Sequence, residues 1–196
     1  MRVGVFGGTF NPPHLGHRVI AEQAVEALGL DRLIWIPALQ SPLKEPYGQA
    51  SAHHRLAMTS LAAANHPAFS VSDLETRRQP PSYTVDTLRA LKTEHPDWTL
   101  HLLIGTDSWD SFERWRAPEE IRSLAEVVVY PRGANTSIDS DAAGVTFLDA
   151  PTIAVSSTMI RARVAGGAAL AGLLDTAVLD YVRAHHLYED PNAEGA

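Results

Sequence analysis

The stretch that decides the fold is Gly7-Gly8-Thr9-Phe10-Asn11-Pro12-Pro13-His14-Leu15-Gly16-His17. It follows a short apolar run, Val3 to Phe6, and it opens the helical pattern of Leu15 to Leu28. A buried strand that enters a helix through a glycine turn is the first half of a strand–helix–strand unit. The sequence therefore predicts an α/β protein whose first loop lies at the end of a strand.

This loop has the chemistry of an anion site. Gly7 and Gly8 leave the backbone bare where a phosphate could approach. His14 and His17 are three residues apart, so they share one face beside the unpaired amides and positive end of the helix. An ordinary turn with two surface histidines is the alternative; metal ligation is another, but no third ligand is obvious nearby. The loop is neither a Walker loop nor the glycine fingerprint of dinucleotide dehydrogenases.

Outward from this loop, strand and helix patterns alternate. Apolar runs typical of buried strands are Val3–Phe6, Leu33–Pro37, Leu100–Ile104 and Val127–Tyr130, with weaker ones at Phe69–Ser72 and Gly144–Leu148. Helical patterns are Leu15–Leu28, Ser51–Asn65, Val85–Glu94 and a short stretch after Pro118. This order predicts a Rossmann-like, doubly wound parallel sheet. Ligands of such folds lie beyond the carboxyl ends of the strands.

The C-terminal part has a different character. Ser156 to Val164 and Leu174 to His185 read as two helices, and we expect them to form a small appendix packed on the sheet. We place a single domain over residues 1–188, with the appendix at about 156–188 and a flexible tail at 189–196. The polar stretch 135–144 reads as a mobile surface loop.

Composition narrows the classes of function. The chain has 196 residues, a formal net charge of −7 and no cysteine, which excludes disulfides and thiol nucleophiles. The acidic balance argues against a nucleic-acid partner. No apolar run is long enough to span a bilayer and no signal peptide is evident, so we expect a cytoplasmic protein without a membrane partner. The oligomeric state stays open, a homo-oligomer included.

A second polar segment, Ser156-Ser157-Thr158-Met159-Ile160-Arg161, precedes the first appendix helix. Ser156 or Ser157 could simply cap that helix. The same amides and hydroxyls, with Arg161 one turn inside, could also form a second phosphate cradle. The residues alone leave both readings open.

Together the two segments resemble the signatures of the nucleotidylyltransferase superfamily, His-x-Gly-His and Ser-Ser-Thr-x-Ile-Arg. The resemblance implies that His14, His17 and Arg161 contact nucleotide phosphates and stabilise the transition state. It implies ATP contacts at Gly7, Gly8, Thr9, Phe10, Gly105, Asp107, Ser157 and Thr158. One departure is Asn11, where many members carry aspartate; asparagine keeps a turn-forming side chain but loses a charge.

Three further segments resemble bacterial nicotinate mononucleotide adenylyltransferases. The block Pro81-Ser82-Tyr83-Thr84-Val85-Asp86-Thr87 implies an acceptor contact at Thr84, although capping alone would also explain that residue. Ile104-Gly105-Thr106-Asp107 ends a strand, where Asp107 faces ATP in the family or merely caps the next helix. Trp115 stands where the family places a tryptophan beside the pyridine ring, with Trp109 as a competitor; Trp35 and Trp98 read as packing residues.

Two basic residues match the family less closely. Lys44, in Ser41-Pro42-Leu43-Lys44, resembles a basic residue that approaches the acceptor phosphate, and Arg132, in Tyr130-Pro131-Arg132-Gly133, resembles a second acceptor contact. The alternative for both is a solvated surface charge.

The resemblance implies an adenylyltransferase that joins AMP from ATP to nicotinate mononucleotide, giving nicotinate adenine dinucleotide and pyrophosphate. We expect Mg²⁺ to bind mainly through the ATP phosphates, because the sequence shows no dedicated carboxylate cage and so no protein ligand for a metal. Two rivals stay open: a phosphopantetheine adenylyltransferase, and a nucleotide-binding regulatory module without catalysis. The preference for nicotinate over nicotinamide, the order of substrate binding and the closure of loop 135–144 are not set by the sequence.

Overall fold

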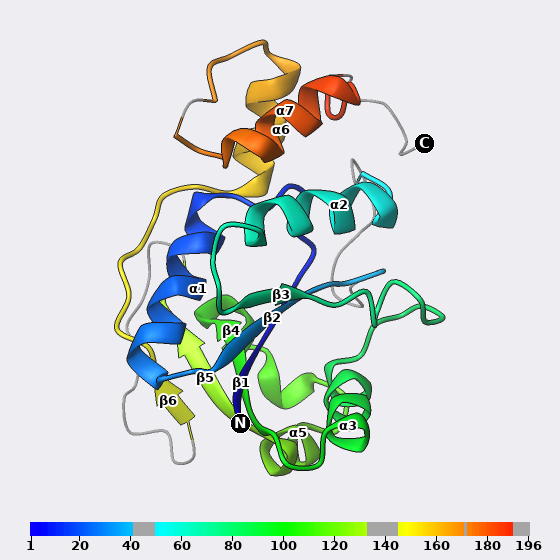
Figure 1. Ribbon diagram of the computed structural model, residues 1–196, viewed down its shortest axis with the longest axis vertical. Helices are drawn as coiled ribbons and strands as arrows, with labels where there is room; N and C mark the ends of the chain where they lie inside the picture. The colour runs from blue at the N-terminus through cyan, green and yellow to red at the C-terminus, as the bar shows by residue number, and fades with distance from the viewer. Residues whose placement is uncertain (41–49, 133–144, 171, 190–196) are drawn as a thin grey trace.

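The centre of the protein is a parallel sheet. The structure, a computed structural model, describes residues 1–40, 50–132, 145–170 and 172–189 (Figure 1). Within these residues the strands are β1 (Arg2–Gly8), β2 (Arg32–Pro37), β3 (Phe69–Val71), β4 (Thr99–Gly105), β5 (Ala125–Tyr130) and β6 (Val145–Phe147). Their order is β3-β2-β1-β4-β5-β6, and every neighbouring pair is parallel. This order confirms the predicted Rossmann-like, doubly wound sheet.

Helices cover both faces of the sheet. They are α1 (Leu15–Leu28), α2 (Ala52–Ala63), α3 (Thr84–Glu94), α4 (Thr106–Trp109), α5 (Pro118–Leu124), α6 (Ser157–Ala165) and α7 (Thr176–Ala184), with a 3₁₀-helix, η1 (Phe112–Arg114). One core joins strand residues such as Val5 to Leu88 of α3 and Ile121 of α5. The other joins residues such as Phe6 to Ile20 of α1. Consecutive residues of β1 thus point to opposite cores, as strand geometry requires.

The appendix does not pack where we expected. Its helices α6 and α7 lie beside α2 (Figure 1). The three helices share a third core, which includes Met58, Ile160 and Val178. The expectation of an appendix packed on the sheet is therefore wrong, because α2 lies between the two. Contacts also tie the appendix to α1: the Leu15 amide donates to the Leu173 carbonyl at 3.0 Å.

Several expected segments match closely and others do not. The helix at Leu15–Leu28 has the predicted bounds, whereas α4 and η1 were not predicted. The polar stretch 135–144 and residues 190–196 of the predicted tail lie outside the described residues. Among the helices that are described, none has the length and apolar character needed to cross a membrane.

The strand order places the site. The chain runs from β1 through β2 to β3 on one side and then returns to β4 on the other side of β1. The crevice beyond the carboxyl ends of β1 and β4 is the topological switch point, where ligands of doubly wound sheets bind. Gly8 ends β1 and Gly105 ends β4, so both predicted glycine segments lie at this edge.

Candidate active site

The two glycines of the first loop differ in what they allow. A Cβ on Gly7 would meet nothing within 4 Å, whereas one on Gly8 would lie 2.9 Å from the Phe10 ring. Phe10 itself has a positive φ of 48° and is buried against Phe6 and Trp35. Gly7 therefore leaves open space, as expected, while Gly8 is needed because Phe10 packs beneath the loop.

The two histidines begin α1 and lie ring to ring. His14 is the N-cap residue, and its ring centroid is 3.7 Å from that of His17. The His14 backbone amide donates to Nδ1 of His17 at 3.2 Å. A neutral His17 ring must then carry its proton on Nε2. The first loop thus fixes the tautomer of His17.

The surroundings of His14 favour its neutral form. Only 9% of its surface is exposed, and burial, with a smaller contribution from Arg132, lowers its pKa to about 4. A charged imidazole is disfavoured there because desolvation penalises the charged form. A bound anion would work in the opposite direction, since it favours the protonated ring.

The second polar segment docks onto the first. Ser156 is the N-cap of α6 and accepts from the Met159 amide at 3.2 Å, so of the two serines Ser156 is the cap. The Ser157 hydroxyl donates to the Pro12 carbonyl at 2.9 Å, across 145 residues of sequence. Arg161 donates to the Asn11 carbonyl at 2.9 Å and to the Thr158 hydroxyl at 3.3 Å. Both sequence segments therefore belong to one site.

Two cavities lie near the carboxyl ends of the central strands. The larger, here the His17 cavity, has a volume of about 520 Å³. Residues that line it are Phe6, His14, Gly16, His17, Ile20, Tyr130, Pro131, Arg132, Pro151, Thr152, Ile153, Ala154, Val155, Ser156 and Met159. Tyr130 and Arg132 also line the second cavity, of about 250 Å³. A site with two adjoining chambers suits two substrates that must meet.

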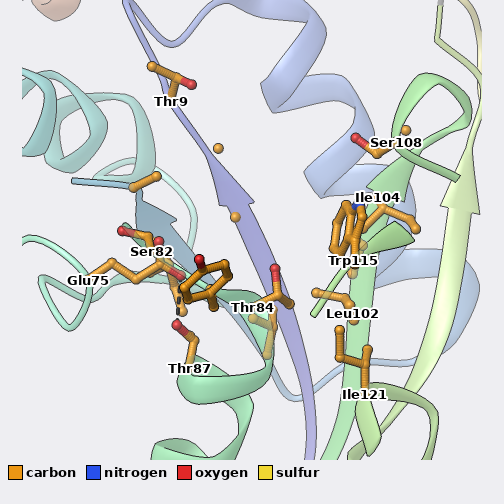
Figure 2. A pocket seen from close by; sticks show the side chains of 18 of the residues that line it. Thr9, Glu75, Ser82, Thr84, Thr87, Leu102, Ile104, Ser108, Trp115 and Ile121 are labelled. Atoms are coloured by element: carbon orange, nitrogen blue, oxygen red, sulfur yellow. Dashed lines mark hydrogen bonds between the residues drawn. The ribbon is translucent and has the colours of Figure 1, made fainter. Parts of the chain in front are cut away.

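The second cavity, here the Trp115 cavity, has an aromatic wall. Figure 2 shows Trp115 with Ile104 on one side and Glu75 with Ser82 on the other. Trp115 is half-buried, and its indole N–H reaches the Ser111 hydroxyl only at 3.4 Å. The competing Trp109 does not line this cavity; it packs on Phe112 with ring centroids 5.2 Å apart.

Thr84 lines the same cavity but does not cap its helix. It is the first residue of α3, and Tyr83 occupies the N-cap position. The reading of Thr84 as a cap is therefore wrong, whereas its position at the cavity is as expected. Because α3 begins at this wall, its positive end faces the space beside Trp115.

At the ends of β4 and β5, Gly105, Asp107 and Arg132 are crowded together. A Cβ on Gly105 would lie 2.6 Å from a carboxylate oxygen of Asp107 and 2.9 Å from Cδ of Arg132. Asp107 and Arg132 form an ion pair at 3.5 Å. Gly105 is the N-cap of α4 and Asp107 lies in its first turn, so the alternative of a capping Asp107 is wrong.

The remaining predicted residues divide into three groups. Gly7, Gly8, Thr9 and Gly105, expected to contact ATP, line the Trp115 cavity. Phe10, Asp107, Ser157, Thr158 and Arg161 line neither cavity within the described residues. Lys44 lies outside the described residues. The individual substrate contacts stay predictions.

Arg55 on α2 was missed by sequence reasoning. Only 2% of it is exposed, and its guanidinium donates to the carbonyls of Thr9 at 2.9 Å, Ala38 at 2.5 Å, Leu39 at 2.9 Å and Ala50 at 3.1 Å. It therefore binds the backbone of the first loop at Thr9 and joins that loop to the segments after β2 and before α2. An arginine in a helical pattern gives no signal of this, because most arginines there face solvent.

Glu75 was also missed. It lines the Trp115 cavity with 8% of its surface exposed, and it accepts from the Thr87 hydroxyl at 2.7 Å. Burial raises the pKa of Glu75, although hydrogen bonds from Thr87 and Ser82 act in the opposite direction. Among the described residues, no three His, Asp or Glu side chains gather as a metal site would require.

Comparison with known proteins agrees with this geometry. The family model described as cytidylyltransferase-like matches residues 5–163. A protein named "Probable nicotinate-nucleotide adenylyltransferase" from Synechococcus sp. (strain JA-3-3Ab) is 42% identical, with 97% of this chain and 96% of that protein covered. A protein of the same name from Salinibacter ruber (strain DSM 13855 / M31) is 41% identical, with 96% and 98% covered.

Solved structures show the same fold. Plasmodium falciparum nicotinic acid mononucleotide adenylyltransferase complexed with NaAD has a TM-score of 0.78 at 18% identity, covering 96% of this chain and 97% of that chain. The same Plasmodium protein complexed with APC has a TM-score of 0.76 at 17% identity, with the same coverage. The identities to the curated relatives, over nearly the whole length of both chains, decide the family. The chain belongs to the nicotinate-nucleotide adenylyltransferases, within the cytidylyltransferase-like family.

Proposed function

We propose that the chain transfers AMP from ATP to nicotinate mononucleotide, forming nicotinate adenine dinucleotide and pyrophosphate. The observation that supports this proposal is the contact between the two signature segments. Ser157 donates a hydrogen bond to the Pro12 carbonyl and Arg161 donates one to the Asn11 carbonyl, beside the paired histidines. Two cavities that share Tyr130 and Arg132 support a site for two substrates. Family membership supplies the class of reaction.

In this proposal the phosphates of ATP lie toward Gly7, Gly8, Thr9 and Gly105 at the edge of the Trp115 cavity, and its base and ribose occupy the His17 cavity. That cavity is the larger one, and its apolar walls suit a base and ribose. His14 and His17 stand at the start of α1, where the helix end favours the triphosphate. His17 presents Nε2–H to a phosphate oxygen because its Nδ1 is already engaged by the His14 amide.

The reaction is a direct in-line displacement. A phosphate oxygen of nicotinate mononucleotide forms a new bond to the α-phosphorus of ATP, and the bond from that phosphorus to the bridging oxygen breaks. The bond's electron pair leaves with pyrophosphate. The attacking oxygen is already anionic, so no strong general base is required. Catalysis then rests on positioning and on donors that stabilise the charged phosphoryl group, for which we propose His14, His17 and Arg161.

Magnesium fits this site as a companion of ATP. The groups that face the junction are imidazoles, guanidinium groups and a helix N-terminus, which suit anions. Asp107, the carboxylate among the predicted site residues, is paired with Arg132. Mg²⁺ would therefore be held by ATP phosphates, where it lowers the negative charge that the acceptor must approach.

The Trp115 cavity holds the pyridine end of the acceptor. The indole offers a flat face for the ring, and ring stacking needs no exact hydrogen-bond geometry. The start of α3 at Tyr83 and Thr84 offers a positive helix end to a carboxylate. Nicotinate carries that carboxylate and nicotinamide does not. Arg132 borders both cavities, which supports the proposal that it contacts the acceptor phosphate.

The test is pyrophosphate release with ATP and Mg²⁺, comparing nicotinate mononucleotide, nicotinamide mononucleotide and phosphopantetheine at equal concentration. We expect fast release with the nicotinate compound. Release with phosphopantetheine alone would refute the pyridine site while keeping the phosphate chemistry. No release with any acceptor, from protein that still binds ATP, would favour a binding module instead.

A further inference from the structure

The hydroxyl group of Tyr188 reaches the first loop from the far end of the chain. It donates to Oδ1 of Asn11 at 2.8 Å, across 177 residues of sequence. Asn11 is buried, with 3% of its surface exposed, and the Ala50 amide donates to the same oxygen at 3.0 Å. The side chain of Asn11 is thus held by the appendix and by Ala50, two residues before the start of α2.

The backbone of Asn11 meets Arg161. Its carbonyl accepts from the guanidinium group at 2.9 Å, and that guanidinium group also donates to Thr158. Asn11 is therefore the joint between two contacts, with Tyr188 on its side chain and Arg161 on its main chain. A shift of Asn11 would move the carbonyl group that holds one side of the guanidinium group.

The protein holds Tyr188 in a specific, strained geometry. After α7 ends at Ala184, His186 and Tyr188 have positive φ angles of 51° and 67°, which side chains other than glycine rarely adopt. The Tyr188 hydroxyl lies 4.0 Å from the sulfur of Met58, and the ring packs on the third core. Strain of this kind persists where surrounding contacts over-determine the conformation.

We propose that Tyr188 is a positioning residue for adenylyl transfer. Through Asn11, it sets the direction in which Arg161 presents its guanidinium group to the ATP phosphates. Burial raises the pKa of Tyr188 above its usual range, so the hydroxyl group stays a donor throughout the neutral and mildly alkaline range. The inference rests on the proposed role of Arg161 in the reaction.

The test begins with Tyr188→Phe, which removes the hydroxyl group and keeps the ring. We expect kcat to fall about tenfold, the loss of one well-placed buried hydrogen bond, while KM for nicotinate mononucleotide stays within about twofold. The matched control is Tyr181→Phe. Tyr181 lies on α7 and its hydroxyl contacts His54 at 3.0 Å, away from the first loop, so this variant should keep the wild-type kcat.

A double-mutant cycle separates positioning from stability. Tyr188→Phe is measured again in an Arg161→Ala background, at a temperature at which melting curves show every variant fully folded. If Tyr188 acts through Arg161, its substitution changes the residual rate less than about twofold there. The same tenfold loss in both backgrounds would overturn the proposal.

The outcomes also distinguish this inference from the proposed function. If Arg161→Ala is slow but Tyr188→Phe keeps the wild-type kcat, the inference is overturned and the proposed function stands. A wild-type rate for Arg161→Ala would overturn the proposed role of Arg161, and the inference with it.

Discussion

Trp115→Ala tests the acceptor cavity most directly. The indole is half-buried and forms one wall of the Trp115 cavity, and its N–H contact with Ser111 at 3.4 Å is at the outer limit of a hydrogen bond. The loss is therefore mainly that of a flat stacking face. Stacking of a base on an aromatic side chain contributes about 1–3 kcal/mol by alanine substitution. Since 1.4 kcal/mol is a factor of ten, KM for nicotinate mononucleotide should rise roughly five- to hundredfold.

The assay is steady-state pyrophosphate release with ATP saturating and the acceptor varied. Trp115→Phe should lose less, because a smaller aromatic face remains. Trp109→Ala is the matched control: it removes an indole that packs on Phe112 outside the cavity, so it should lower the melting temperature without raising KM for the acceptor. An unchanged KM in Trp115→Ala, or a rise only in Trp109→Ala, would refute the placement of the pyridine ring.

Three further predictions follow from the histidines and the buried glutamate. His17→Ala should lower kcat about a hundredfold, or roughly 3 kcal/mol, with little change in ATP affinity measured by titration calorimetry; equal turnover would contradict the assignment. Burial lowers the pKa of His14 from 6.5 to about 4, so the unfolded chain binds a proton at this residue more readily than the folded protein does. The free energy of unfolding should therefore fall by roughly 3 kcal/mol as the pH drops from 6.5 to about 4. Urea unfolding at several pH values should show a smaller fall for His14→Gln, and an identical fall would count against a buried neutral ring. Burial raises the pKa of Glu75, so the wild-type protein should lose stability as pH rises above the usual pKa of a glutamate and the buried carboxyl group ionises. Glu75→Gln should therefore gain stability relative to the wild type from acid to neutral pH. Parallel pH profiles of the two proteins would show that burial does not control this carboxyl group.

Much of the fold follows from local patterns. The helix at Leu15–Leu28 has the bounds that its periodicity and the following Gly29 indicate, with Gly29 at a φ of 57°. A long helix with strong apolar periodicity can be predicted because the repeat of apolar residues shows which face is buried. The helix Thr106–Trp109 could not be predicted in this way, because four residues make barely one turn and show no apolar repeat.

Long-range contacts explain the rest of the differences. The appendix was expected on the sheet, yet it covers α2, because Met58 and Ala62 of α2 face away from the sheet into the third core. Arg55 looks like a surface charge in the sequence and instead bonds to loop carbonyls. Such partners come from distant segments, so no local pattern announces them. The domain boundary at residue 188 and the cytoplasmic location stay predictions.

The bonds that join the first loop to the appendix have a consequence for synthesis of the protein. Asn11 and Pro12 are made well before their partners Ser157, Arg161 and Tyr188, which lie 145 to 177 residues further along the sequence. The phosphate site therefore cannot be completed while a nascent chain still lacks its appendix. ATP, which we propose binds the completed site, would favour molecules in which the first loop and the appendix are joined, and would stabilise the two segments together.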